Sequence, residues 1–429
     1  MKELVVNLNT GLHGDLEVPG DKSISHRSVI LSSISEGTSH VHHFLASDDC
    51  ISTINAFREM GVQIDLDGDE LTVTGVGLHG LNEPQTKLDM GNSGTTTRLL
   101  SGLLSAQNFT TNLIGDDSLS KRPMKRVSEP LSMMGARIET TDGYLPMTIN
   151  PGHIKAVKYE LPIASAQVKS AIILAALNAD ADSVVIEPQV TRNHTETMLN
   201  QFGKDVIERD GNQIIVHHNP KLTAQDFNVP GDISSAAFFM VAATLVPNSH
   251  IVLKNVGINA TRTGILDVLI KMGANVKLLN QTNSSEPTAD IEVTYTPDLK
   301  PIDVTEESIP LMIDELPLVA LLASRANGHS HITGAEELRF KETDRIQTVV
   351  MELQKLGIQI TELPDGFSID GSKDWRVANS SLDSHGDHRI GMTLAVAALL
   401  LDTSVQLDGE DAISISYPQF FDHLKRLCS

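Results

Sequence analysis

The chain has few cysteines, few aromatic residues and no long apolar segment. Its 429 residues include two cysteines and one tryptophan, and aromatic residues make up 4% of the total. Cys50 and Cys428 are too few for a disulfide framework, and neither stands in a CxxC or metal-ligand spacing. No apolar run approaches the roughly 20 residues that a membrane helix needs, and the opening MKELVVNLNTG lacks the apolar core of a signal peptide. We therefore expect a soluble, cytoplasmic protein with no membrane partner.

Positive charge is also scarce. The chain has 33 Lys and Arg residues against 55 Asp and Glu residues, which gives a formal net charge of −22 at pH 7. Such a balance argues against nucleic acid or an acidic membrane as a partner. An acidic protein can still bind a small anion where it gathers its few cations in one place, and that is the class of ligand we expect.

One short pattern returns along the chain. A helix-like apolar stretch, a glycine and a strand-like alternation follow one another, as in FREMGVQI and LIKMGANV. The glycines of the successive copies are Gly61, Gly135, Gly203, Gly273 and Gly357. A period of roughly 70 residues is too long for a solenoid repeat and too short for a domain of average size. A sixth helix, FFDHLKRLCS, reaches the C-terminus, so we predict six copies of one small unit.

Each copy expands to the order β-α-β-α-β-β. The first helix of each copy carries little charge on any face, which predicts burial nearly all round. These helices are expected at Ser28–Ile34, Thr97–Ala106, Ser170–Ala179, Ser235–Val246, Glu315–Ala326 and Gly391–Leu401. The second helix ends at the repeated glycine, which suits a left-handed C-cap, and a hairpin follows. A longer loop near Asn280–Pro287 replaces the usual Asp-Gly turn in the fourth copy.

A second symmetry predicts two lobes of three copies each. VPGDKSIS at Val18 and VPGDISSA at Val229 are nearly identical and stand three copies apart. The last copy lacks its closing strands, whereas Leu4–Leu8 is a spare strand at the start. We predict an α/β protein with one discontinuous lobe, residues 1–18 plus 231–429, and a second lobe, residues 19–230. Buried helices would lie inside and sheets outside, with the active site in the cleft between the lobes.

The loops that enter the apolar helices hold most of the distinctive polar residues. Examples are PGDKSISHR, GNSGTTTR, ASAQVKS, IDELP and GDHR. Free N–H groups and a partial positive charge at a helix N-terminus suit phosphate or carboxylate. Cations accompany these loops: Lys22, Arg27, Arg98, Lys121, Arg122, Arg126, Arg192, Lys341, Arg345 and Arg389. So many cations predict two anionic ligands, or one with several charges.

Each motif also has a plainer interpretation. KETDR is a common solvated charge pattern on helices, and GNSGTTTR can be an ordinary helix entry with Asn92 or Ser93 as N-cap. His40, His42 and His43 alternate in a predicted strand without partners to complete a metal site, so we interpret them as surface residues and expect no metal. His388 opens a buried helix and is a better functional candidate.

Taken together, the motifs resemble one family closely. PGDKSISHR, GNSGTTTRL, KRPMKRV, SAQVKSA, RNHTE, VPGDISSAAF, IDELP, KETDR and DHRIGM are similar to those of the bacterial 5-enolpyruvylshikimate-3-phosphate (EPSP) synthases, from about Val18 to Pro418. The resemblance implies the two-lobed enolpyruvyl transferase fold and no metal or organic cofactor. It also implies transfer of the enolpyruvyl group of phosphoenolpyruvate to the 5-hydroxyl of shikimate 3-phosphate, through a tetrahedral intermediate and with release of phosphate, as a step of aromatic amino acid biosynthesis.

The resemblance also implies roles for particular residues. The shikimate 3-phosphate site would comprise Lys22, Ser23, Arg27, Ser165, Gln167, Arg192, Asp314 and Lys341. The phosphoenolpyruvate site would comprise Lys22, Gly94, Arg122, Gln167, Arg345 and Arg389. Asp314 would act as base on the acceptor hydroxyl and Glu342 as the acid that protonates the enol methylene, with Lys22 as a third possible proton carrier. The order of these proton transfers stays open.

The chain departs from many family members at its C-terminal end and in two motifs. Ile415 stands where many members have a lysine, just before Ser416-Tyr417-Pro418. Asn92-Ser93-Gly94 and Arg192-Asn193-His194 are typical of the second subtype of this glyphosate target family, which is often less sensitive to glyphosate.

Three other functions remain in competition. The sister enzyme that transfers enolpyruvyl to UDP-N-acetylglucosamine shares the fold but has a cysteine in a mobile loop where this chain reads DDSLSKRP, Asp116–Pro123. A non-catalytic repeat scaffold would not need cations at the entrances of buried helices. An RNA-end-processing enzyme fits poorly with a charge of −22. We expect a monomer.

Overall fold

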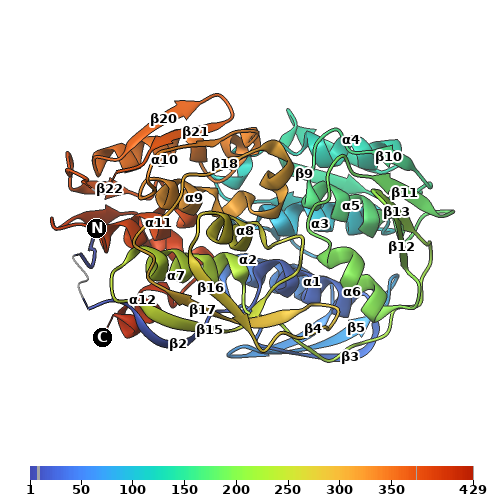
Figure 1. Cartoon of the computed structure of the whole chain (residues 1–429). Coiled ribbons are helices and arrows are strands. Elements are labelled where there is room, and N and C mark those ends of the chain that lie inside the picture. The colour runs from blue at the N-terminus through green and yellow to red at the C-terminus, as the bar shows by residue number, and fades with distance from the viewer. Residues whose placement is uncertain (7–9, 373, 429) are drawn as a thin grey trace. The chain divides into compact units, whose positions relative to one another are not determined.

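The chain forms two compact units, and each is built from helices and strands in the order that the sequence predicts. The computed structural model describes residues 1–6, 10–372 and 374–428 (Figure 1). One unit, which we call the discontinuous unit, comprises Met1–Pro19 and Pro230–Ser429, and the other, the continuous unit, comprises Gly20–Val229. Among the described residues, no helix combines the length and the apolar character needed to cross a membrane.

The continuous unit contains three sheets and six α-helices among its elements. Its helices are α1 (Lys22–Ser33), α2 (Asp48–Glu59), α3 (Gly94–Leu104), α4 (Lys125–Met133), α5 (Ala166–Ala176) and α6 (His194–Phe202), with a 3-10 helix η1 (Leu119–Lys121). Its strands are β3 (Glu36–His42), β4 (Gln63–Asp67), β5 (Glu70–Val76), β6 (Leu88–Asp89), β7 (Thr111–Ile114), β8 (Arg137–Thr141), β9 (Tyr144–Asn150), β10 (Lys158–Glu160), β11 (Ser183–Ile186), β12 (Ile207–Asp210), β13 (Gln213–Val216) and β14 (Phe227–Asn228).

The described part of the discontinuous unit also contains three sheets and six α-helices. Its helices are α7 (Ile233–Leu245), α8 (Gly264–Lys271), α9 (Leu316–Ala323), α10 (Arg345–Lys355), α11 (His388–Ala398) and α12 (Phe420–Leu427), with the 3-10 helices η2 (Glu306–Leu311), η3 (Ile313–Glu315), η4 (Glu336–Phe340) and η5 (Glu410–Ile415). Its strands are β1 (Lys2–Glu3), β2 (His13–Glu17), β15 (His250–Gly257), β16 (Asn275–Leu279), β17 (Thr288–Thr294), β18 (Asp303–Val304), β19 (His329–Ile332), β20 (Gln359–Leu363), β21 (Gly366–Asp370), β22 (Ser381–Asp383) and β23 (Gln406–Asp408).

Five of the six sheets have the same four-stranded arrangement. In the sheet β6-β7-β9-β8, β6 runs parallel to β7, and β7 continues antiparallel into the hairpin of β9 and β8. The predicted order β-α-β-α-β-β produces this pattern, because a helical crossover joins the parallel pair and a tight turn joins the hairpin. The α/β class with three sheets in each unit is confirmed.

The two nearly identical VPGD segments mark the places where the chain passes between units. Strand β2 precedes α1 in the sequence, yet it pairs in parallel with β15 of the discontinuous unit. Strand β14 precedes α7, yet it pairs in parallel with β3 of the continuous unit. The first strand of each half of the sequence therefore completes a sheet in one unit, whereas the helix that follows it belongs to the other unit.

The N-terminal segment completes the sheet of the last copy. Lys2 and Glu3 pair antiparallel with Leu407 and Gln406 of β23, and Leu4 N donates to Val405 O at 3.1 Å. Figure 1 shows the N-terminus next to the red C-terminal segments of the same unit. The strand predicted at Leu4–Leu8 is thus found at Lys2–Glu3, two residues earlier in the sequence. Residues 7 and 8 of the predicted strand lie outside the described part of the chain.

The repeated glycines cap their helices at four of the five predicted places. Gly61, Gly135, Gly273 and Gly357 have φ values between 84° and 99°, the left-handed region that favours glycine. The prediction for Gly203 was wrong, since its φ is −143°. The third copy, LNQFGKDVI, has one residue more than the others after its glycine, and Asp205 takes the left-handed conformation there, with φ of 51°.

The first helix of each copy lies in the core, as predicted. Every residue of α7, α9 and α11 is buried. In the other unit, α1 is buried from Ile24 onwards, α3 from Leu99 and α5 from Val168. Each unit has its own cluster of buried apolar residues. Strands such as β9 alternate buried and more exposed positions, so one face of the sheet packs on the helices and the other meets solvent. The starts of the buried helices are thereby held rigidly within each unit.

Candidate active site

The three buried helices of the continuous unit begin with capped first turns. Asp21 Oδ1 accepts from Ile24 N at 2.9 Å in α1, and Ser93 Oγ accepts from Thr96 N at 3.1 Å in α3. Ser165 Oγ accepts from Val168 N at 3.4 Å in α5. A helix start of this kind presents backbone N–H groups and the positive end of the helix dipole, which attracts anions.

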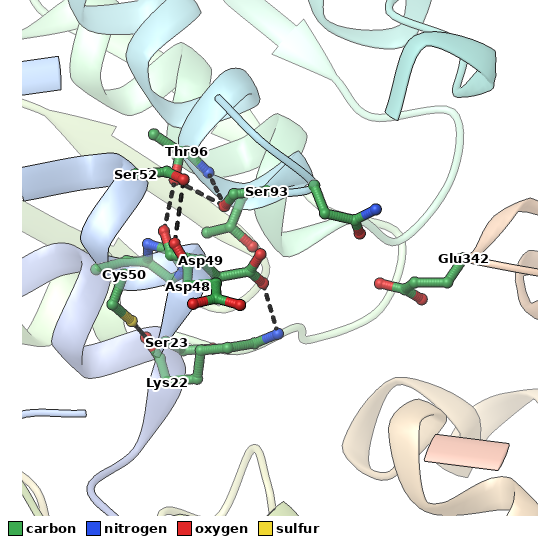
Figure 2. A network of polar contacts seen from close by, with 12 residues as sticks. Lys22, Ser23, Asp48, Asp49, Cys50, Ser52, Ser93, Thr96 and Glu342 are labelled. Carbon is green, nitrogen blue, oxygen red and sulfur yellow. Dashed lines mark hydrogen bonds and ion pairs between the residues drawn. The ribbon is translucent and has the colours of Figure 1, made fainter. Parts of the chain in front are cut away.

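Lys22 lies at the start of α1 and is paired with a carboxylate. Its Nζ donates to Asp49 Oδ2 at 2.9 Å, and Asp49 lies in the first turn of α2 (Figure 2). The two side chains are 19% and 9% exposed. The pair holds the ammonium group of Lys22 at a fixed place while leaving part of it accessible. Asp49 was not predicted, because an acidic pair at a helix start is also an ordinary stabilising feature.

Arg27 links the three helices α1, α5 and α6 through uncharged oxygens. Its Nε donates to Thr195 Oγ1 at 2.7 Å, its Nη2 to Ser170 Oγ at 2.9 Å and its Nη1 to Ser23 O at 3.0 Å. Arg192 Nη1 donates to Ser23 Oγ at 3.4 Å. The structure therefore brings together Ser23, Arg27 and Arg192, three of the residues predicted for shikimate 3-phosphate.

A second group of predicted residues meets at the start of α3. A Cβ atom placed on Gly94 would lie 2.9 Å from Arg98 Nη1 and 3.0 Å from Arg122 Nη1, so both guanidinium groups lie against this glycine. Arg98 Nη1 donates to Gln167 Oε1 at 2.6 Å. Gln167 Nε2 donates in turn to Thr95 Oγ1 at 3.0 Å, which links the starts of α3 and α5.

The structure brings together Gly94, Arg122 and Gln167 of the predicted phosphoenolpyruvate site. Lys22, the fourth residue predicted from this unit, pairs with Asp49. The structure also adds Arg98, which the sequence singled out as a cation but did not assign to a ligand. Arg122 Nη2 donates to Asn92 Oδ1 at 3.3 Å, so the guanidinium is held from the loop before α3. Lys121, in contrast, is exposed on η1.

In the discontinuous unit, one arginine holds three carboxylates. Arg345 is 1% exposed, and its Nε lies 2.7 Å from Asp387 Oδ2. Its Nη2 lies 2.6 Å from Glu342 Oε2, and its Nη1 lies 3.3 Å from Asp314 Oδ1. Although burial by itself lowers the pKa of this guanidinium, the three carboxylates raise that pKa above its ordinary value. Lys341 Nζ also approaches Asp314 Oδ1, at 3.6 Å.

This arrangement places the predicted base and the predicted acid on a single guanidinium group. Asp314 and Glu342 come from separate segments, η3 and the loop before α10, and both contact Arg345. Asp387 is the buried N-cap of α11 and accepts from Arg389 N at 2.9 Å. The predicted residues Asp314, Lys341, Glu342 and Arg345 therefore form one cluster, and the sequence reasoning missed Asp387 although it lies in the GDHR motif.

Arg389 belongs to a neighbouring buried network in the same unit. Its Nη1 lies 3.8 Å from Glu315 Oε1, and Glu315 accepts a short hydrogen bond from Ser234 Oγ. Arg262 Nη2 donates to Ser234 Oγ at 2.9 Å and to Asp232 Oδ1 at 3.1 Å. The starts of α7, α9 and α11 are thus connected by charged groups. In the other unit, Arg98 connects the starts of α3 and α5, and Lys22 connects the starts of α1 and α2. His388 is buried at the first position of α11.

The remaining sequence candidates are the histidines of β3 and Ile415 of η5. His40 Nδ1 pairs with Asp226 Oδ1 at 2.9 Å, and His42 Nδ1 pairs with Glu70, on the solvent-facing side of β3. Within residues 1–6, 10–372 and 374–428, no three His, Cys, Asp or Glu side chains form a group suited to a metal ion. Ile415 is partly buried at the end of η5.

Comparison with known proteins identifies the family. A family model described as EPSP synthase (3-phosphoshikimate 1-carboxyvinyltransferase) matches residues 6–424. The 3-phosphoshikimate 1-carboxyvinyltransferase of Lactiplantibacillus plantarum is 53% identical over 428 residues, which cover 100% of this chain and 99% of the relative. The corresponding protein of Bacillus cereus is 50% identical over 432 residues, with 100% of each chain covered.

Solved structures agree with this result. The structure of EPSP synthase from Acinetobacter baumannii matches with a TM-score of 0.87 and 44% identity, covering 99% of this chain and 97% of that one. The enolpyruvyl transferase NikO from Streptomyces tendae has a TM-score of 0.79 at 18% identity, which shows the shared fold alone. The predicted enolpyruvyl transferase fold is therefore confirmed, and this chain belongs to the EPSP synthase family.

Proposed function

We propose that this chain is a transferase that moves the enolpyruvyl group of phosphoenolpyruvate to the 5-hydroxyl of shikimate 3-phosphate and releases phosphate. The observation that carries the proposal is the family match over residues 6–424, with relatives of that name at about half identity over the whole chain. The clusters at the helix starts support it, because they contain cations in positions suited to two anionic substrates.

The continuous unit would bind most of the shikimate 3-phosphate. Arg27 and Arg192 are connected through Ser23, and Lys22 follows directly on the cap of α1. Arginine suits bidentate contacts with phosphate, whereas the lysine ammonium acts as a compact charge. We assign Lys22, Ser23, Arg27, Ser165, Gln167 and Arg192 of this unit to the acceptor.

Phosphoenolpyruvate would bind at the start of α3. Gly94 allows the guanidinium groups of Arg98 and Arg122 to lie against the backbone, and Gln167 orients Arg98. From the discontinuous unit we assign Arg345 and Arg389 to phosphoenolpyruvate, and Asp314 and Lys341 to the acceptor. This assignment requires the helix starts of both units to face a common cleft, and that arrangement is part of the proposal.

The chemistry of these residues fits an addition followed by an elimination. The acceptor oxygen attacks C2 of phosphoenolpyruvate while the C3 methylene takes a proton, which gives the tetrahedral intermediate. The bond between C2 and the phosphate oxygen then breaks, and C3 loses a proton. Asp314 would accept the hydroxyl proton, and the cations would stabilise charge on the departing phosphate.

Glu342 would protonate C3, and its contact with Arg345 sets a condition for that role. A carboxyl group 2.6 Å from a guanidinium is favoured as the carboxylate. Glu342 can act as an acid only if binding of the anionic substrates draws the Arg345 charge toward them. The arginine would then serve in turn as partner of the acid and of phosphoenolpyruvate.

Two alternatives lead to different results in one assay. The sister transferase would use UDP-N-acetylglucosamine as acceptor, and a scaffold would use no substrate. The protein is mixed with phosphoenolpyruvate and either shikimate 3-phosphate or UDP-N-acetylglucosamine, and phosphate release is measured. We expect phosphate release when the acceptor is shikimate 3-phosphate and none when it is UDP-N-acetylglucosamine. Release with the sugar nucleotide alone would overturn the acceptor assignment, and release with neither would contradict an enolpyruvyl transferase.

The proposal includes the state of the protein in the cell. We propose a monomer in the cytoplasm whose partners are its two small-molecule substrates. Sedimentation at micromolar concentration should give a single species of the mass of one chain, 46.4 kDa. A species of twice that mass at all concentrations would contradict the monomer.

A further inference from the structure

A buried charge cluster in the continuous unit has no part in the chemistry described above. Lys169 Nζ, on α5, lies 3.1 Å from Glu187 Oε2 and 2.7 Å from Glu196 Oε1. Arg209 of β12 contacts the same two carboxylates, at 2.6 Å and 3.8 Å. The side chains of Lys169 and Glu187 are completely buried. We call these four residues the Lys169 cluster.

The Lys169 cluster is not explained well by stability alone. Taking charges out of water is unfavourable, and well-packed apolar residues of similar volume often stabilise a fold equally well. The cluster does hold two positive and two negative groups, so it is balanced. Although burial raises the pKa of Glu187, the Lys169 charge and the hydrogen bonds to its carboxylate bring that pKa below its ordinary value. Glu187 is therefore a carboxylate at neutral pH.

Glu187 and Lys169 of the cluster hold Thr191, the residue just before Arg192. Glu187 Oε2 accepts from Thr191 N at 3.1 Å and from Thr191 Oγ1 at 2.8 Å. Lys169 Nζ donates to Thr191 O at 3.4 Å. Both backbone groups of Thr191 and its hydroxyl are thus held by charged partners, which limits the positions open to Arg192.

Lys169 and Glu196 of the cluster are sequence neighbours of the hydroxyl residues that contact Arg27. Ser170, which accepts from Arg27 Nη2 at 2.9 Å, follows Lys169 in the sequence. Thr195, which accepts from Arg27 Nε at 2.7 Å, precedes Glu196. The ion pair between Lys169 and Glu196 therefore ties together the two helix segments whose hydroxyl groups orient Arg27.

We propose that Lys169 and Glu187 are positioning residues for the acceptor substrate. They hold Thr191 and the start of α6 so that Arg192 and Arg27 present their guanidinium groups in one orientation to the anionic group of shikimate 3-phosphate. This inference rests on the proposed function. It predicts a selective effect on the acceptor, because the contacts found for the Lys169 cluster among the described residues reach Thr191 and not Gly94 or Arg122.

The test uses steady-state kinetics with each substrate varied in turn, together with calorimetric binding of shikimate 3-phosphate alone. Thr191→Val removes one hydrogen bond to Glu187 without a change of charge, and Thr191→Ser keeps that hydroxyl as the matched control. A second variant, Lys169→Met with Glu196→Gln, removes one cation and one carboxylate, so the remaining Glu187 and Arg209 stay paired.

We expect the KM and the Kd for shikimate 3-phosphate to rise about threefold in Thr191→Val and about tenfold in the double variant, while kcat and the KM for phosphoenolpyruvate stay within about twofold. Thr191→Ser should match the wild type. Asp182→Asn is a stability control, because Asp182 pairs with His217 and His218 on the surface, next to the sheet that contains Arg209. It should lower the melting temperature and leave the acceptor KM unchanged.

The possible outcomes distinguish a failure of the proposed positioning role from a failure of the proposed enzymatic function. A wild-type protein that neither binds shikimate 3-phosphate nor turns over contradicts the proposed function. A wild type that turns over, with Thr191→Val and Thr191→Ser showing the same acceptor KM, overturns the inference. A fall in melting temperature with both KM values unchanged also overturns it, since the cluster would then be structural only. If the double variant does not fold, the comparison of the two Thr191 variants decides.

Discussion

Lys22 and Asp49 form an ion pair between the first turns of α1 and α2, with Nζ and Oδ2 2.9 Å apart (Figure 2). The lysine is one of two residues, with Gln167, that the family resemblance implies for both substrates, and the aspartate has no direct role in the proposed chemistry. Because the ammonium group is mostly buried beside a carboxylate, its position is set before any ligand binds. The pair thus links the packing of two helices to the placement of a functional charge.

Replacing Asp49 with asparagine should weaken the enzyme without unfolding it. Asn keeps the shape of the side chain but loses the charge that holds Lys22, so we expect kcat/KM to fall by about tenfold, or about 1.4 kcal/mol of transition-state stabilisation. Asp48→Asn is the matched control, because Asp48 is the exposed neighbour in the same helix turn. Equal activity of the two variants would show that the ion pair does not position Lys22.

Adding a methyl group at Gly94 should affect one substrate more than the other. The new Cβ in Gly94→Ala would lie about 3 Å from the guanidinium nitrogens of Arg98 and Arg122, both of which must then move. We expect the KM for phosphoenolpyruvate to rise about tenfold and the KM for shikimate 3-phosphate to change less than threefold. Steady-state kinetics with each substrate varied measures this difference, and an unchanged phosphoenolpyruvate KM would remove Gly94 from that site.

The repeating unit could be predicted from the sequence because its signals are local. Apolar helices with little charge, left-handed glycines and tight hairpins depend on residues close together in the chain. Gly61 and Gly357 confirm this. Gly203 does not, because one additional residue moved the left-handed position to Asp205, and a shift of one residue changes no pattern that can be recognised in a single sequence.

The cations of the candidate site could be predicted, but their carboxylate partners could not. Arg345 belongs to a distinctive motif, whereas the importance of Asp387 follows from a contact across 42 residues of sequence. The contacts of Asp49 with Lys22 and of Glu187 with Lys169 likewise join separate segments of the chain, and Asp49 also resembles an ordinary acidic residue at a helix start. Pairing between separate helices is decided by how they pack in three dimensions, and nothing in the spacing of a single chain indicates it. Lys169 belongs to the SAQVKSA motif, and the motif by itself does not indicate that this lysine is buried.

The two proposed proton carriers should have different kinetic signatures from the binding residues. Glu342→Gln and Asp314→Asn keep the contacts of Arg345 with oxygen atoms but remove the ability to exchange a proton. We expect kcat to fall by about 10²- to 10⁴-fold, with the Kd values of both substrates within about threefold of wild type. Rapid-quench measurements of a single turnover test this, and a kcat within twofold of wild type in either variant would exclude that residue as a proton carrier.

The stability of the continuous unit should depend on pH through Asp182. Hydrogen bonds from His218 and His217 hold the pKa of this carboxyl group below its ordinary value. A carboxyl group with a lowered folded-state pKa contributes stability above its unfolded pKa of about 3.9, and that contribution is lost as the pH falls toward the folded-state pKa. We expect Asp182→Asn to lower the melting temperature at pH 6, and to lower it less at pH 3.

A difference between the wild type and Asp182→Asn that stays constant from pH 6 to pH 3 would contradict this interpretation. The group is exposed, so the effect on the melting temperature should also diminish in high salt. Circular dichroism at both pH values measures it.

We propose that anion-binding helix starts from both units act on the same two substrates. The decisive experiment is a crystal structure of the protein with shikimate 3-phosphate and phosphoenolpyruvate bound. We expect Lys22 and Arg192 of the continuous unit to contact the acceptor. We also expect Arg122 of this unit and Arg345 of the discontinuous unit to contact the same phosphoenolpyruvate molecule. Ligands held by one unit alone, with Arg345 still paired only to its three carboxylates, would contradict it.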